Sequence, residues 1–100
     1  MPKIAVTVPH QLSEAEALER VKGLLGELKQ EYAGTFSQLQ ESWQNNEGTF
    51  AVKAMGLDLS GDLSVKPDRV DLNGKLPLTA APFKGRVEQM IRERMERLLA

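Results

Sequence analysis

The sequence contains no cysteine, a single histidine and only five aromatic residues in 100. Without cysteine, disulfide bonds, thiolate metal sites and cysteine nucleophiles are excluded. A formal net charge of −1 gives no overall field that would attract nucleic acid, so we expect no nucleic-acid partner. No apolar run approaches the roughly 20 residues of a membrane span, and the N-terminus does not resemble a signal peptide. These absences predict a cytoplasmic protein without integral membrane association.

Metal and cofactor chemistry also finds little support. One histidine and no cysteine leave carboxylates as the main metal ligands, which would suit calcium or magnesium. Four aspartates in the second half do not follow a calcium-loop spacing: Asp58, Asp62, Asp68 and Asp71. Gly56 and Gly61 do not form a glycine-rich phosphate loop. We therefore predict neither a metal site nor a cofactor.

What the sequence does contain is period-two alternation between Gly48 and Leu78. Apolar residues share one parity (Leu57, Leu59, Leu63 and Val65), and polar residues share the other (Asp58, Ser60, Asp62 and Ser64). Such alternation is typical of strands with one buried face. With two stretches of helical periodicity, it predicts an α+β fold: an antiparallel sheet of about five strands with two helices on one face. The expected order is strand, helix, four strands, helix, in one domain spanning residues 1–100.

The N-terminal half supplies a strand and a helix. Ile4, Val6 and Val8 alternate and predict a first strand that pairs at a sheet edge. Ser13 stands three residues before Glu16, a capping-box spacing that opens a helix. An apolar stripe then follows at helical spacing: Ala17, Val21, Leu24, Leu25, Leu28 and Tyr32. Glycines at positions 23 and 26 interrupt good helix formers, which favours close backbone packing on the sheet, with a hinge or ligand contact as the alternative.

The remaining strands and a second helix follow. Phe36 to Gln44 predicts a strand, and the inner parity then changes between Ala54 and Leu57. Either Met55-Gly56 is a two-residue hairpin turn, which we favour, or Gly56 is a bulge within a longer strand. Pro82 suits the first position of a C-terminal helix. Its apolar stripe is Phe83, Val87, Met90, Ile91, Met95, Leu98 and Leu99.

The C-terminal helix also carries basic residues: Lys84, Arg86, Arg92, Arg94 and Arg97. A basic amphipathic helix can lie on a membrane or granule surface. Acidic residues dilute this charge, and spacings such as Glu88–Arg92 are typical of a solvated helix face, so we favour a helix that covers the sheet. Surplus apolar residues on it would suit a small pocket or a dimer seam. The expected pocket lining is Phe50, Leu63, Leu72, Met90 and Met95, which would otherwise simply fill the core.

Two single residues are further candidates for a site. His10 could act as a general base, but the sequence identifies no partner that would orient it. A polar contact at the loop or helix start is therefore the favoured interpretation. Trp43 is interpreted as a core residue, with an anchor at the rim of an interface as the alternative.

Several short motifs occur in the order of a known family. They are Pro9-His10-Gln11-Leu12 followed by Glu14-Ala15, Trp43 before a Gly-x-Phe, Gly61 to Val65, Asp68-Arg69-Val70, and Leu76-Pro77 followed by Pro82 to Glu88. From about Ile4 to Leu99 the chain thus resembles the polyhydroxyalkanoic acid system proteins, also called the polyhydroxyalkanoate granule-region family. The resemblance implies a bacterial locus for storage-polyester synthesis. It implies no defined reaction or catalytic residues, and His10 and Trp43 match recurring positions.

The leading hypothesis is a small non-enzymatic protein of polyhydroxyalkanoate storage that acts by binding. Its partner would be the granule surface, a granule protein or an acyl intermediate. One alternative is a small acyl-directed enzyme with His10 as base. Another is a purely structural homodimer that uses the polar sheet face or the Trp43 region. By architecture alone, the expected fold resembles a reduced helix-grip arrangement, which does not fix the function.

Overall fold

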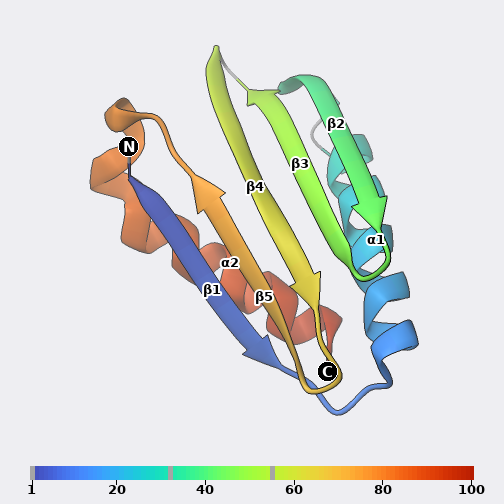
Figure 1. Ribbon diagram of the computed structural model, residues 1–100. Helices are drawn as coiled ribbons and strands as arrows, with labels where there is room; N and C mark the ends of the chain where they lie inside the picture. Colours follow the sequence, from blue (N-terminus) through green and yellow to red (C-terminus); the bar gives the residue numbers. More distant parts are fainter. Residues whose placement is uncertain (1, 32, 55) are drawn as a thin grey trace.

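The computed structural model describes residues 2–31, 33–54 and 56–100, which form the expected α+β fold (Figure 1). The strands are β1 (Lys3–Pro9), β2 (Phe36–Gln44), β3 (Glu47–Ala54), β4 (Leu57–Val65) and β5 (Arg69–Lys75). The helices are α1 (Glu14–Glu31) and α2 (Lys84–Leu98), and a 3-10 helix, η1 (Leu78–Phe83), precedes α2. Their order along the chain matches the prediction, apart from the added 3-10 helix.

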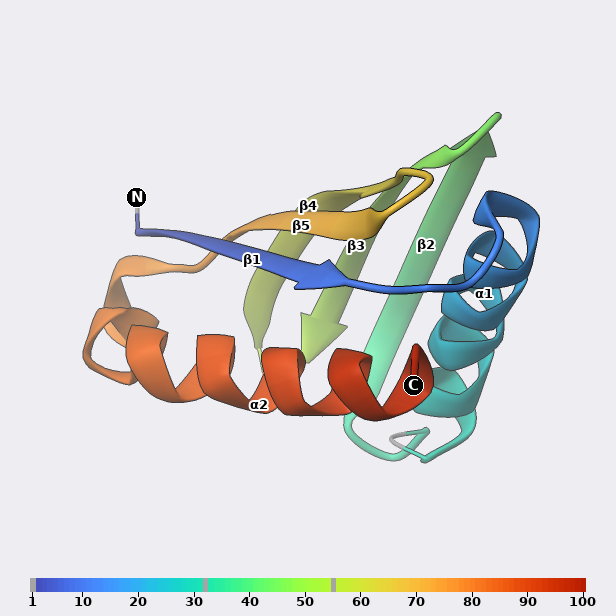
Figure 2. The same cartoon turned by 90° about the horizontal axis from the view of Figure 1, so that it is seen from below.

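The strands form one antiparallel sheet in the order β1-β5-β4-β3-β2. Strands β2 to β5 are consecutive neighbours and make a meander, while β1 pairs with β5 at one edge, as predicted. Strand β2 forms the other edge. Both helices lie on the same side of the sheet, as Figure 2 shows. The sheet therefore has one face covered by helices and one face open to solvent.

Alternation places the apolar side chains on the helix side. The strands contribute a buried set consisting of Ile4, Val6, Val8, Leu63, Val65, Val70 and Leu72. The open face is polar and carries cross-strand hydrogen bonds. Thr7 Oγ1 donates to Asp71 Oδ1 (2.8 Å), and Asn73 Nδ2 donates to Asp62 Oδ1 (3.3 Å). The period-two pattern thus agrees with the structure, because its apolar positions face the helices and its polar positions face solvent.

Helix α1 begins where the capping spacing predicts. The backbone N–H of Glu16 donates to Ser13 Oγ at 3.2 Å, which satisfies one of the free donors of the first turn. The buried members of the stripe are Ala17, Val21 and Leu24. Tyr32 lies outside the described residues. The prediction of close packing at the two helix glycines is wrong, because a Cβ built on Gly23 or Gly26 would meet nothing within 4 Å.

The link between β3 and β4 follows the favoured hairpin arrangement. Ala54 pairs with Leu57, so two residues connect the strands. Gly56 has a φ of +77°, a left-handed conformation that glycine adopts without steric cost. Met55, the other residue of the predicted turn, lies outside the described residues.

The C-terminal helix differs from the prediction at its start. Pro82 lies inside η1, and α2 begins two residues later, at Lys84. Phe83 occupies the N-cap position of α2 without a side-chain hydrogen bond and is 55% exposed, so the prediction that it begins the apolar stripe of this helix is wrong. The physical reason is that η1 turns the chain with a different period, which rotates Phe83 away from the apolar face of α2.

Three strand glycines lie directly against large side chains of neighbouring strands. A Cβ on Gly48 would lie 2.8 Å from ring atoms of Trp43, and a Cβ on Gly74 would lie 2.9 Å from Ile4. A Cβ on Gly61 would lie 2.7 Å from Phe50 and would overlap the backbone of β5. These positions therefore require the absence of a side chain, unlike the two helix glycines.

Helix α2 also covers the free edge of β1. The backbone N–H of Ala5 donates to Glu88 Oε2 (3.0 Å), and Arg92 Nη1 donates to the carbonyl oxygen of Thr7 (3.2 Å). A helix rises about 6 Å over four residues and a strand about 7 Å over two, so the two spacings match. Glu88 and Arg92, which sequence spacing suggested as a pair, thus bind the strand edge instead.

Candidate functional site: an apolar cavity between the sheet and both helices

A cavity of about 430 Å³ lies between the inner face of the sheet, α1 and α2. Helix α1 contributes Val21, Leu24, Leu25 and Leu28. The strands contribute Leu39, Phe50, Val52, Leu63 and Leu72, and α2 contributes Met90, Ile91 and Met95. This volume falls in the range of roughly 300–1,000 Å³ that is typical of small-molecule sites.

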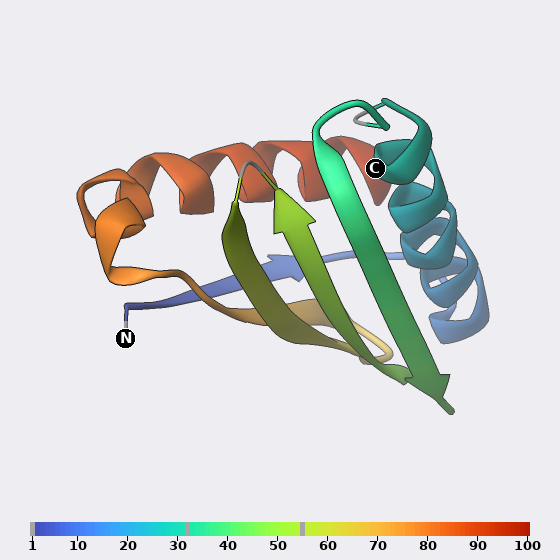
Figure 3. The same cartoon turned by 90° about the horizontal axis from the view of Figure 1, so that it is seen from above.

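The cavity exists because the two helices diverge over the sheet. Figure 2 shows α2 running along β1, while α1 stands beside β2 at a steep angle to α2. Figure 3 shows the same divergence from the opposite side. Two helices packed in parallel would cover the middle strands, since helices pack about 8–10 Å apart and strands lie about 4.8 Å apart. The inner side chains of β3, Phe50 and Val52, stay half-buried, whereas Leu63 and Val65 of β4 are buried.

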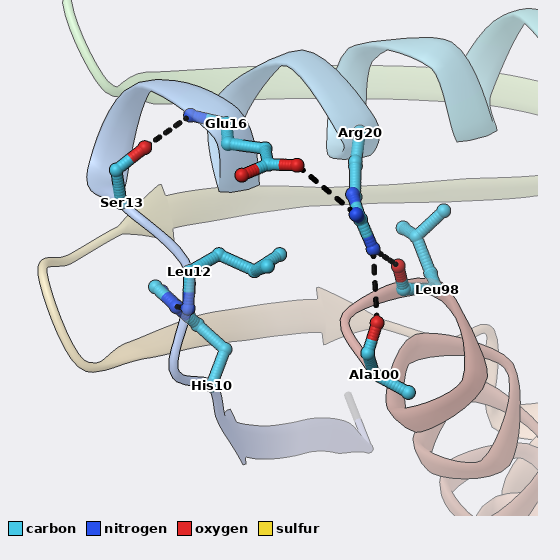
Figure 4. A network of polar contacts seen from close by, with 7 residues as sticks. All are labelled: His10, Leu12, Ser13, Glu16, Arg20, Leu98 and Ala100. Carbon is cyan, nitrogen blue, oxygen red and sulfur yellow. Dashed lines mark hydrogen bonds and ion pairs between the residues drawn. The ribbon is translucent and has the colours of Figure 1, made fainter.

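The two helices still meet at one end through polar contacts (Figure 4). Arg20 of α1 donates from Nη1 to the carbonyl oxygens of Leu98 (3.0 Å) and Ala100 (3.1 Å). Its Nη2 pairs with Glu16 at 3.0 Å. These bonds satisfy free carbonyl groups at the end of α2 and fasten it to the first half of α1.

Charged residues of α2 form the polar part of the cavity wall: Glu93, Arg94 and Arg97. Arg94 Nη2 pairs with Glu31 of α1 at 3.0 Å and approaches Glu27 at 3.9 Å. Arg97 donates to the carbonyl oxygen of Glu93, at 3.5 Å. The charged groups therefore lie along α2, next to an otherwise apolar wall, and one of them links the two helices.

The five residues predicted to line a pocket all lie on this wall. Leu63, Leu72 and Met95 are buried, and Phe50 is half-buried. Met90 is 60% exposed and therefore marks a side of the cavity that is open to solvent. The contributions of α1 and β2 were not predicted, although the helical stripe from Val21 to Leu28 could have indicated them. That these residues bind a ligand stays a prediction.

His10 lies in the loop between β1 and α1 (Figure 4); it is buried and is not one of the residues that line the cavity. The backbone N–H of Leu12 donates to its Nδ1 at 3.1 Å, so that nitrogen carries no proton. Its Nε2 lies 2.9 Å from the carbonyl oxygen of Lys66 and, in the neutral ring, donates to it. Both ring nitrogens are thus engaged by backbone groups, which favours the structural interpretation over the general base.

Trp43 also lies off the cavity wall and is half-buried. Its ring lies across Gly48, its partner in β3, and its Nε1 donates to Glu41 Oε2 at 3.2 Å. Lys22 of α1 places its Nζ 5.4 Å from the ring centroid, within cation–π range. Trp43 therefore joins the edge strand β2 to α1 through its contact with Lys22. Its role as an interface anchor stays a prediction.

In residues 2–31, 33–54 and 56–100, no three His, Cys, Asp or Glu side chains gather where they could hold a metal ion. Neither of the helices described is long and apolar enough to cross a membrane.

Comparison with known proteins gives a family and a distant structural neighbour. No curated protein matches the chain. The crystal structure of TTHA0849 from Thermus thermophilus aligns with 98% of this chain and 92% of its own, at 14% sequence identity and a TM-score of 0.39. The family model described as "Putative polyhydroxyalkanoic acid system protein" matches residues 4–99. The order and spacing of the short motifs thus have their explanation in common descent, and the chain belongs to this polyhydroxyalkanoic acid system family.

Proposed function

We propose that the protein binds the apolar chain of an acyl compound, such as a medium-chain hydroxyacyl or fatty-acyl group, in the cavity between its sheet and helices. The observation that carries the proposal is the cavity itself, with its volume of about 430 Å³ and its largely aliphatic wall. Family membership links the chain to the polyhydroxyalkanoate system, whose building blocks are acyl compounds of this class. The protein would then act in that system by holding an acyl intermediate.

The composition of the wall supports binding rather than catalysis. Among the described residues, its polar members are three charged residues of one stretch of α2: Glu93, Arg94 and Arg97. Arg94 is held by Glu31, and Glu93 accepts a hydrogen bond from Gln89 at 3.0 Å. His10, the alternative general base, is not on the wall. The alternative of an acyl-directed enzyme based on His10 therefore has less support from the geometry.

The shape of the site makes a quantitative expectation possible. Each methylene group removed from water stabilises a complex by about 0.8 kcal/mol, which is roughly a fourfold change in the dissociation constant. Affinity should therefore rise by about this factor with each added methylene until the chain fills the cavity. Beyond that length the affinity should level off, because further methylenes would stay in water. A chain-length series thus reports on the cavity rather than on surface adsorption.

The experiment measures the thermal unfolding midpoint with saturated fatty acids and 3-hydroxy acids of increasing chain length. A ligand at 100 times its dissociation constant stabilises the native state by about 2.7 kcal/mol. For a domain of this size that corresponds to a rise of roughly 10–20 °C. The absence of a shift with every chain length would overturn the proposal. The search would then turn to a granule protein or to the granule surface as the partner.

A matched pair of variants locates the binding. Ile91 of α2 lies on the cavity wall, so Ile91→Trp should fill part of the cavity and abolish the shift given by the longer chains. Gln89 is exposed on the same helix and lies off the wall, so Gln89→Trp should leave the shift unchanged. If both variants responded to the ligands as the wild type does, binding would have to lie outside the cavity.

A further inference from the structure

One end of the molecule exposes apolar side chains that the core does not use. Leu78 is 74% exposed and Phe83 is 55% exposed, and both belong to η1. The neighbouring Ala81 and Pro82 are also exposed. Isolated exposed leucines are ordinary, but here several apolar residues project from one short turn. Figure 1 shows this turn at one end of the molecule, beside the N-terminal end of β1 and the start of α2.

Four basic residues lie close to this turn along the chain or in the strand pairing, two of them on the open face of the sheet. Lys3 and Lys75 are opposite each other in the pairing of β1 with β5, next to the point where the chain enters η1. Lys84 and Arg86 lie in the first turn of α2, directly after η1. All four are exposed, and none has an ion-pair or hydrogen-bond partner for its side chain among the described residues. We call these four residues, together with Leu78 and Phe83, the η1 end.

Two acidic groups on elements next to the η1 end bind or lie opposite other residues. The carboxylate of Glu88 accepts the hydrogen bond from the Ala5 backbone. Asp58 lies opposite Lys53 in the pairing of β3 with β4. The first turn of α2 contains no acidic residue. The η1 end is therefore locally basic, although the whole chain has a formal net charge of −1.

This arrangement does not serve the stability of the fold. The N-terminus of a helix carries a partial positive charge and favours acidic side chains, so Lys84 and Arg86 in the first turn are unfavourable there. Phe83 occupies the N-cap position, where Ser, Thr, Asp or Asn would satisfy a free N–H group. Exposed apolar surface adds no stability either. The same three departures would suit a function in which this end contacts something apolar and anionic.

We propose that the η1 end docks the protein on an anionic phospholipid surface. Leu78 and Phe83 would enter the boundary between headgroups and acyl chains, while the four basic residues would contact the anionic headgroups. A protein partner fits less well, because a stable protein interface takes about 800 Å² from each side, more than this one turn offers. A lipid surface needs only a few projecting apolar side chains with nearby cations. The proposal does not depend on the acyl cavity, from which Leu78 and Phe83 are absent.

The experiment is sedimentation with vesicles of phosphatidylcholine alone and of equal parts phosphatidylcholine and phosphatidylglycerol. Wild-type protein should sediment with the anionic vesicles and not with the neutral ones. Each cation contributes about fivefold to binding at an anionic surface, so Lys84→Gln/Arg86→Gln should weaken it by about 30-fold. The control Lys29→Gln/Lys66→Gln changes the net charge equally, at exposed or half-exposed sites away from this end, and should bind as the wild type does.

Two further measurements separate docking from other kinds of binding. Leu78→Ser/Phe83→Ser should lose the vesicle binding that persists at raised salt, without a fall in the unfolding midpoint, because both side chains are largely exposed and serine suits the N-cap at position 83. Ile91→Trp should sediment as the wild type does, since it changes only the cavity. Equal weakening by both glutamine pairs, loss of binding in Ile91→Trp, or no sedimentation with anionic vesicles would each overturn the proposal. The last result would direct attention to an acidic protein partner.

Discussion

Gly61 offers the sharpest test of how the sheet is packed. It lies in β4 opposite Gly74, at the point where the ring of Phe50 crosses from β3. A Cβ built on Gly61 would overlap the carbonyl oxygen of Asn73 and would lie 2.7 Å from Phe50 Cζ and 3.0 Å from the Cα of Gly74. Gly61→Ala would therefore add one methyl group where there is room for none.

The loss of stability in Gly61→Ala depends on which of the neighbouring atoms can move away from the added methyl group. The Phe50 ring can rotate away, but the carbonyl of Asn73 is backbone and belongs to the strand paired with β4. Overpacking costs typically 1–3 kcal/mol, and we expect the upper end because β4 and β5 would have to separate. A loss of about 3 kcal/mol is a large part of the 5–15 kcal/mol by which domains are stable. It corresponds to a fall in the unfolding midpoint of roughly 12–24 °C.

The control is the same substitution in α1. Nothing lies within 4 Å of a Cβ built on Gly26, so Gly26→Ala should stabilise the protein by about 0.5–1 kcal/mol, because alanine is the better helix former. The assay is urea unfolding followed by circular dichroism, with the midpoint and the slope fitted separately. Equal effects of Gly61→Ala and Gly26→Ala, or a neutral Gly61→Ala, would refute the account of the sheet glycines.

Three further predictions concern single side chains. His10→Ala should destabilise the protein by about 2–4 kcal/mol in urea unfolding, because two backbone groups lose their hydrogen-bond partner. The variant should keep the thermal shifts that ligands induce. If a folded variant lost those shifts, the enzyme hypothesis would regain support. Arg94→Leu should lower the free energy of unfolding by less than about 1 kcal/mol, because the pair with Glu31 is partly exposed. The same variant should bind ligand faster in stopped-flow measurements, because the pair joins the two helices beside the cavity, and an unchanged rate would contradict this role. Glu88→Ala should raise light scattering on mild heating, because the edge of β1 is then uncovered, whereas Gln89→Ala should not.

The strands and their faces could be predicted because the sheet is wet on one side. Alternation from Leu57 to Val65 records that asymmetry directly, and the pairing of Leu63 with Leu72 then follows from the hairpins. The capping of α1 by Ser13 was also predictable, because that interaction spans only three residues. Local rules thus suffice wherever the stabilising contact is local or period-two.

Other features depend on how distant elements meet. The i,i+4 spacing of Glu88 and Arg92 suits an ion pair on a solvated helix as well as it suits hydrogen bonds to a strand. Only the position of α2 along β1 shows that the two side chains bind the strand backbone. Parity put Phe50 and Leu72 on the inner face, but the cavity beside them depends on the angle between two helices, which periodicity does not encode. The predicted homodimer also stays a prediction, and light scattering of the purified protein would test it.

The hydrogen bond between the Ala5 amide and Glu88 has a consequence for measuring occupancy of the cavity. The carboxylate of Glu88 is carried by α2, which also carries Met90, Ile91 and Met95 of the cavity wall. A displacement of α2 away from β1 that admits a ligand would lengthen this bond. A ligand that draws α2 closer to β1 would shorten it. The Ala5 amide resonance and its rate of hydrogen exchange are therefore a built-in sensor, which reports from an exposed strand edge on events in the interior.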